Sequence, residues 1–371
     1  MSNEDETHGF EGFLVDRARR KQAAQQPAPA KAHDIIRSAH FNGAATDTYW
    51  LSAAWSHDGA QVAVGGRNPS GTHGKLEIWN GHTGHLEGHG TRHLRHDLAG
   101  PVVSMSWSPD GTRLATIEGD VKSSRHVLNI RSQADGKRPI DIPLGPSQVA
   151  WSPDGSQLAL SAPGARGVHL VDVAGGQPRR TLAGVSGPVA WEPGGHRIAA
   201  PDGPNVAIFD AATGQRERTI TGQQHQATAV SWATRGKVLA VSDGEHIRVV
   251  DADSGERLWN LPWVTAEGDR SDDPSVHYLG WLDSGRYLLE FRKHGAWSRS
   301  DANTRIGTVA VWDITTRSLF WCFFHETILR VQRPPAKILV APQGGRQTLI
   351  FFDHQPPQVW EITGDLPGYQ P

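Results

Sequence analysis

Apolar and polar residues alternate along most of this chain in short runs, and residues that favour tight turns separate the runs. Val149 stands two positions before Trp151, so both side chains face the same side of a strand. Pro153, Asp154 and Gly155 follow and are typical of a tight turn, because proline restricts φ and glycine accepts a positive φ. This pattern predicts an all-β protein of short antiparallel strands.

The same unit recurs seven times. Its first landmark is the string Trp-Ser-Pro-Asp-Gly or a looser copy, which begins at Trp55, Trp107, Trp151, Trp191, Trp232 and Trp281, with a seventh form at 340–344. Its second landmark is an apolar pair followed by a polar residue, which is Asn80, Ser132, Asp172, Asp210, Asp251, Asp313 and Glu361. The first landmarks stand 40 to 59 residues apart, and a four-stranded propeller blade repeats every 40 to 45 or so residues. The repeats predict seven four-stranded blades.

The seventh unit has too few residues after Glu361 to supply a fourth strand of its own. The segment 33–38, just ahead of the first unit, resembles fourth strands elsewhere, such as 218–221. We assign it as the outer strand of the seventh blade, which removes a free sheet edge. The predicted fold is a seven-bladed β-propeller of four-stranded antiparallel blades, closed by an N-terminal strand. It spans 34–365, with terminal segments 1–33 and 366–371.

These units resemble the WD40 and WD40-like propeller families over nearly the whole chain, in a bacterial type marked by Trp-Ser-Pro-Asp-Gly repeats. The resemblance implies the fold and a binding surface formed by the loops that join second to third and fourth to first strands. The chain departs from the strict WD40 pattern, because the Gly-His before the first strand is missing and Gly222-Gln223 is its nearest counterpart. We therefore expect the tryptophans between blades to contribute more of the cohesion.

Composition narrows the classes of partner and compartment. The net charge of −2 and the charged fraction of 20% give no reason to expect nucleic acid or a membrane surface as a partner. Cys322 is the only cysteine, which excludes an internal disulfide and fits a reducing compartment. We find neither a secretory signal at the N-terminus nor an apolar run of the roughly 18–20 residues that a membrane span requires. We expect a cytoplasmic protein, and the excess of arginine over lysine is typical of a GC-rich bacterial genome.

One basic segment stands out among the predicted loops of the binding surface. Its basic residues surround a tryptophan, a composition suited to an acidic or phosphorylated peptide. The candidate partner-binding residues are Arg292, Lys293, His294, Trp297, Arg299 and Arg305. The alternative is mutual screening with the acidic residues of the preceding loop, Glu267, Asp269, Asp272 and Asp273.

Two further segments carry candidate chemistry. Five histidines between His82 and His96 could hold a metal ion, but the glycines among them argue against a helix that would align them, so we expect an exposed polar loop and no metal site. The N-terminal segment contains Phe10, Phe13 and Leu14 ahead of several basic residues, a pattern that fits a short amphipathic helix for docking. The alternative for this segment is a disordered tail.

No recognised catalytic motif accompanies the repeats. Propeller enzymes need His, Asp or Glu facing the central channel from the first strands, and the corresponding positions here are Ser52, Val103, Ser147, Pro188, Ala229 and Tyr278. We therefore expect a non-enzymatic scaffold or adaptor that binds protein partners and needs no cofactor. The alternatives are a propeller that binds a small molecule or a metal, and a propeller hydrolase or lyase with a site in its channel.

Overall fold

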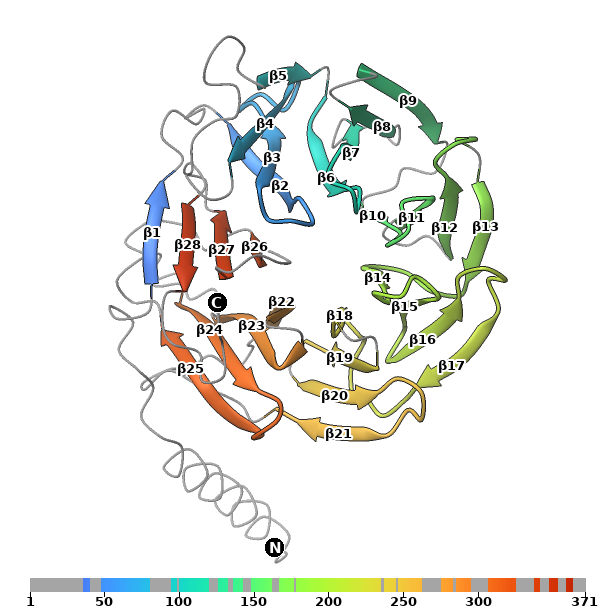
Figure 1. The fold of residues 1–371 in the computed structure, drawn as a ribbon, viewed down its shortest axis with the longest axis vertical. Helices are drawn as coiled ribbons and strands as arrows, with labels where there is room; N and C mark the ends of the chain where they lie inside the picture. The colour runs from blue at the N-terminus through green and yellow to red at the C-terminus, as the bar shows by residue number, and fades with distance from the viewer. Residues whose placement is uncertain are drawn as a thin grey trace, which may run out of the picture.

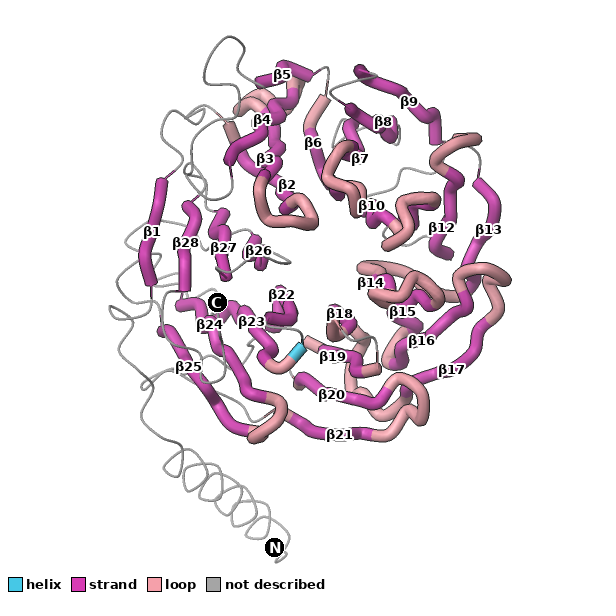
Figure 2. Tube along the Cα trace, in the orientation of Figure 1, coloured by secondary structure: helices cyan, strands magenta, loops and turns pink. Residues whose placement is uncertain are grey.

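The computed structural model consists almost entirely of strands and short connections in its described part, with one short helical turn before β23 (Figure 2). It describes residues 36–40, 48–80, 95–98, 100–119, 126–132, 136–142, 148–161, 167–176, 178–234, 237–244, 246–261, 275–282, 285–294, 306–324, 337–340, 347–352 and 358–362. Within these ranges no helix has the length and apolar character needed to cross a membrane. The all-β class predicted from the sequence is confirmed.

The strands form seven four-stranded antiparallel sheets. Sheet 1 contains β2 (Tyr49–Trp55), β3 (Gln61–Arg67), β4 (Gly74–Asn80) and β5 (Arg95–Leu98). Sheet 2 contains β6 (Val102–Trp107), β7 (Arg113–Gly119), β8 (His126–Ser132) and β9 (Gly136–Ile142). Sheet 3 contains β10 (Gln148–Trp151), β11 (Gln157–Ser161), β12 (Gly167–Asp172) and β13 (Pro178–Ala183). Sheet 4 contains β14 (Ala190–Trp191), β15 (Arg197–Asp202), β16 (Asn205–Asp210) and β17 (Arg216–Ile220).

The remaining three sheets complete the chain. Sheet 5 contains β18 (Ala229–Trp232), β19 (Val238–Ser242), β20 (Ile247–Asp251) and β21 (Arg257–Asn260). Sheet 6 contains β22 (Ser275–Leu282), β23 (Tyr287–His294), β24 (Ile306–Asp313) and β25 (Ser318–Phe324). Sheet 7 contains β26 (Lys337–Val340), β27 (Gln347–Phe352), β28 (Gln358–Ile362) and, from the other end of the chain, β1 (Ile36–His40).

The sheets follow one another around a common centre, each with its first strand innermost (Figure 1). First strands of consecutive sheets contact each other from β2 through to β26, and β26 in turn contacts β2. On the outside of sheet 7, β1 pairs antiparallel with β28, with Ile36 opposite Ile362 and His40 opposite Gln358. The described strand Ile36–His40 overlaps the segment 33–38 that the sequence pattern assigned to the outside of the seventh unit.

The core lies between the sheets, because alternate residues of each strand face the sheet before and the sheet after. Between sheets 2 and 3, Ala115 and Ile117 of β7 pack with Leu158 and Leu160 of β11, and all four side chains are buried. The same packing recurs between other neighbours. A single sheet would expose both apolar faces to water, so each sheet depends on its neighbours.

A hydrogen-bonded turn joins the first strand to the second in several sheets. In sheet 1 the Ser56 Oγ lies 2.6 Å from the Asp58 Oδ1, which accepts the amide of Ala60 at 3.0 Å. The amide of Gly59 bonds to the Ser56 carbonyl at 2.9 Å, and Gly59 has a φ of 70°. Ser108-Asp110 and Ser152-Asp154 repeat these contacts. The positive φ predicted for the turn glycine is confirmed.

Tryptophans at the ends of the first strands bond to the preceding sheet. The Trp107 Nε1 donates to the Ala54 carbonyl at 3.0 Å. The equivalent bonds run from Trp191 to Ala150, from Trp232 to Ala190 and from Trp281 to Ser231, at 3.3, 3.0 and 3.0 Å. In each case the acceptor belongs to the residue just before the preceding sheet's own tryptophan. The repeat therefore fixes the register between neighbouring sheets as well as within them.

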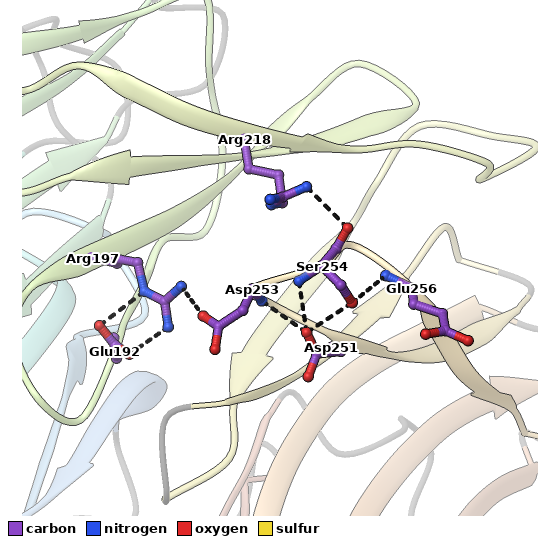
Figure 3. A network of polar contacts seen from close by, with 7 residues as sticks. All are labelled: Glu192, Arg197, Arg218, Asp251, Asp253, Ser254 and Glu256. Atoms are coloured by element: carbon purple, nitrogen blue, oxygen red, sulfur yellow. Dashed lines mark hydrogen bonds and ion pairs between the residues drawn. The ribbon is translucent and has the colours of Figure 1, made fainter.

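Arginine side chains add a second link between sheets 4 and 5 (Figure 3). Arg197 of β15 donates to both carboxylate oxygens of Glu192 and to the Asp253 Oδ1 at 2.6 Å. These hydrogen bonds, above all those donated to Glu192, raise the pKa of the Arg197 guanidinium. Arg218 of β17 bonds to the Ser254 carbonyl at 2.9 Å. Both contacts reach the turn that follows β20, so this turn anchors sheet 5 to sheet 4.

Candidate interaction surface

The connections between strands divide into two sets at opposite ends of the sheets. At the turn end, the connections from first to second strands span five residues in each of the first five sheets, at 56–60, 108–112, 152–156, 192–196 and 233–237. At the loop end, the connections from second to third strands range from 203–204 in sheet 4 to 295–305 in sheet 6. Those from fourth to first strands range from 99–101 to 261–274. The loop end is the more variable, although 81–94 is a long connection at the turn end.

Arg292 does not belong to a surface loop, which corrects the prediction from sequence. It lies in β23, its side chain is 1% exposed, and its Nε and Nη2 donate to the Glu290 Oε2 at 3.1 and 3.0 Å. Because side chains alternate along a strand, residues 288, 290 and 292 lie on one face of β23. On this face Leu288 packs with Ala240 and Ile247 of sheet 5. The guanidinium therefore serves the contact between sheets 5 and 6 and cannot reach an external partner.

Lys293 and His294 also lie in β23, as its last two residues, where the sequence analysis placed a loop. The other candidates of this segment, Trp297, Arg299 and Arg305, lie outside the described residues, as do Glu267, Asp269, Asp272 and Asp273. The partner-binding role of the segment stays a prediction for the residues beyond Arg292.

The other candidate segments lie largely outside the described part of the chain. Phe10, Phe13 and Leu14 are outside it, as are His82, His85, His89 and His93. His96 belongs to β5. Across the described ranges, no three His, Cys, Asp or Glu side chains gather as metal ligands.

The positions predicted to face the channel are described, apart from Ser147. Ser52 is buried, and the half-buried ones are Val103, Pro188, Ala229 and Tyr278.

Several buried charged groups lie between the sheets at positions that the sequence patterns did not single out. Glu77 on β4, Glu118 on β7 and Glu290 on β23 are all buried. Glu118 accepts hydrogen bonds from Thr116 and Arg131, and Glu290 from Arg292. The sequence does contain a signal for these buried glutamates. Each stands in a strand of otherwise mainly apolar or small residues, and a polar residue lies two positions away or on the neighbouring strand.

One described loop-end connection, 68–73 in sheet 1, is cross-linked by its own side chains. The Asn68 Oδ1 accepts the amides of Thr72 and His73 at 3.0 and 3.2 Å. The Thr72 Oγ1 contacts the Ser70 Oγ at 2.8 Å and the His73 Nδ1 at 2.9 Å. Gly71 at the tip has a φ of 74°, which glycine adopts without strain. Ser70, Thr72 and His73 are all exposed, so a loop of defined shape presents two hydroxyls and an imidazole to solvent.

A second described loop-end region joins sheets 4 and 5. Asp243 is buried after β19, and its carboxylate accepts the amides of Gln224 and His246 at 3.1 and 2.8 Å. Gln223 is also buried and precedes the first strand of sheet 5. Asp243 therefore holds two loop-end connections together.

Comparison with known protein families adds no assignment to this geometry. No family model matches the chain.

Proposed function

We propose that this chain is a closed, seven-bladed, WD40-like β-propeller and that it works as a non-catalytic scaffold, binding protein partners through its loop end. Three observations support the closed propeller: there are seven four-stranded sheets, β26 of the last sheet contacts β2 of the first, and β1 pairs with β28. Ring closure by strands from both ends of the chain removes a free sheet edge.

The contrast between the two ends of the sheets carries the functional part of the proposal. At one end, five-residue turns join the first strand to the second in each of the first five sheets, with hydrogen bonds that repeat from sheet to sheet, whereas connections of many lengths occupy the other end. Loops that differ from repeat to repeat, held by a rigid repeated framework, are where repeat proteins place their binding residues. The arrangement suits recognition of an extended or irregular partner surface.

The test compares substitutions at the two ends in the full chain. We expect a Trp297→Ala/Arg299→Ala variant to lose the proteins that co-purify with the wild-type chain from its native host. A His57→Ala/Gln215→Ala variant is the matched control, because both residues are exposed at the turn end. Equal melting temperatures would show that both variants fold. Retention of every partner by the loop-end variant would contradict the proposal.

A further inference from the structure

We propose that Arg67, together with the 68–73 loop, binds the phosphate group of a phosphorylated serine or threonine in a partner peptide. The inference deepens the proposed function, because it assigns partner chemistry to the loop end. It rests on three observations about Arg67: its position, its neighbours and the absence of an acidic partner among the described residues.

The guanidinium of Arg67 is held in place before any ligand arrives. Arg67 ends β3 and lies opposite Tyr49, the first residue of β2, and its Cζ stands 5.1 Å from the centre of the Tyr49 ring. On the loop side the Arg67 Nη1 lies next to Gly71. A Cβ atom added to this glycine would be only 3.3 Å from the Nη1. The cation–π contact and the glycine fix the side chain while leaving it half-buried. Little rotamer entropy remains to be lost on binding.

Among the described residues no carboxylate pairs with Arg67. Several other arginines have such partners, namely Arg179 with Asp172, Arg216 with Asp202 and Arg286 with Asp313, whereas Arg113 at the turn end resembles Arg67 in lying over an aromatic ring. A half-buried guanidinium has lost part of its hydration, and its planar array of donors matches the oxygens of a phosphate or carboxylate. The unpaired charge at the loop end therefore favours an anion from outside the chain.

The neighbouring side chains favour phosphate over carboxylate. Ser70 and Thr72 flank Gly71, against which the guanidinium lies, and both hydroxyls are exposed. His73 contacts Thr72 through Nδ1, and no contact within the described chain occupies its Nε2. A phosphate monoester has three acceptor oxygens and a charge of roughly −1.5 to −2, so it can accept from both the Arg67 guanidinium and the His73 ring, while the two hydroxyls hydrogen-bond within the loop and hold its shape. The Asn68 hydrogen bonds keep the loop in the shape that presents them.

The experiment uses the full chain and a fluorescent peptide pool with a central phosphoserine flanked by randomised positions. Fluorescence anisotropy gives the apparent Kd, and pools with serine or glutamate at the centre are the comparison probes. We expect binding of the phosphoserine pool, competition by inorganic phosphate and at least about a tenfold loss of affinity in Arg67→Ala. Arg67→Lys, which keeps the charge but not the fork, should recover only part of the loss.

Arg113→Ala is the matched control, because Arg113 also lies over an aromatic ring, 4.9 Å from Trp151, but begins a second strand and so lies at the turn end. Its affinity for the pool should equal that of the wild type. Equal losses in Arg67→Ala and Arg113→Ala would overturn the inference, as would equal binding of the glutamate pool. Absence of phosphoserine binding by a chain that still captures its partners would overturn the inference and leave the proposed function standing.

Discussion

The contact between sheets 4 and 5 and the contact between sheets 5 and 6 have the same apolar packing and tryptophan hydrogen bond. They differ in how far their charged side chains are buried. Each has a tryptophan that donates to the preceding sheet, Trp232 to Ala190 and Trp281 to Ser231, both at 3.0 Å. Between sheets 4 and 5, however, one member of the charged group, Asp253, reaches solvent and is 56% exposed. Between sheets 5 and 6, Glu290 and Arg292 are 0% and 1% exposed.

This difference shows which interactions the repeat requires and which it tolerates. The tryptophan bond recurs at four of the sheet contacts and follows from the repeated sequence. Among the ion pairs of the described residues, only Glu290 and Arg292 have both side chains almost completely buried, and the desolvation of this pair offsets much of its attraction. A buried pair is therefore weak evidence for net stabilisation, yet loss of one partner is costly because the other charge stays buried.

The largest effect is expected from Arg292→Met, which leaves Glu290 buried without its hydrogen-bond donors. Urea unfolding should show a loss of about 3–5 kcal/mol in the free energy of unfolding. The double variant Glu290→Leu/Arg292→Met should be much closer to the wild type, because it removes both charges. A double variant as unstable as the single one would contradict the account of this contact.

An intermediate effect is expected from Trp232→Phe and Trp281→Phe. Each removes an indole N–H from a buried carbonyl and leaves a small cavity, so each should cost about 1–3 kcal/mol. The two losses should agree within about 0.5 kcal/mol, because both sheet contacts use the same bond. Unequal losses in urea unfolding would show that the shared design does not contribute equally at the two contacts.

A smaller effect is expected from Arg197→Ala. The ion pair of Arg197 with the exposed Asp253 contributes little to the free energy of unfolding. The substitution also removes the two charged hydrogen bonds that Arg197 donates to the buried Glu192. The expected loss is about 1 kcal/mol, and high salt should reduce it. A loss as large as that of Arg292→Met would remove the distinction between the two contacts.

The smallest effect is expected from Ser108→Ala in the turn of sheet 2. The Ser108 hydrogen bond is the main cause that holds the pKa of Asp110 below its usual 3.8. A carboxylate with a lowered pKa contributes stability that is complete above about pH 4 and is lost as the pH falls through the lowered value. The variant should cost about 0.5–1 kcal/mol at pH 7, and the difference should shrink below pH 4. A difference that grows towards low pH would contradict the assignment.

Much of the fold could be predicted because the repeat carries its own register. The turn after Trp151 places Val149 opposite Leu160, and the pattern around residues 158–161 and 247–251 gives strands that match β11 and β20. The N-terminal strand was predictable because the seventh unit lacks a fourth strand. These features are local and periodic, so a single sequence reveals them.

The candidate site was less predictable because its decisive features are contacts between strands far apart or within a loop. Arg292 was assigned to a loop because it stands among charged residues, although the alternation of Leu288, Glu290 and Arg292 fits a strand with one buried face. The cation–π contact of Arg67 with Tyr49 depends on the pairing of β2 with β3, and no sequence pattern shows that the described part of the chain offers Arg67 no carboxylate.

The pairing of the two chain ends tests the central claim of a closed ring most directly. Arg37 and Glu361 are opposite each other in β1 and β28, close enough for a disulfide between cysteines at these positions. In a Cys322→Ser background, an Arg37→Cys/Glu361→Cys variant should form an intramolecular disulfide on mild oxidation, detected by intact mass and gel mobility. An Arg37→Cys/Glu217→Cys variant, which joins β1 to sheet 4, should form none. Failure of the first pair to cross-link, or equal cross-linking of both, would contradict the closed ring.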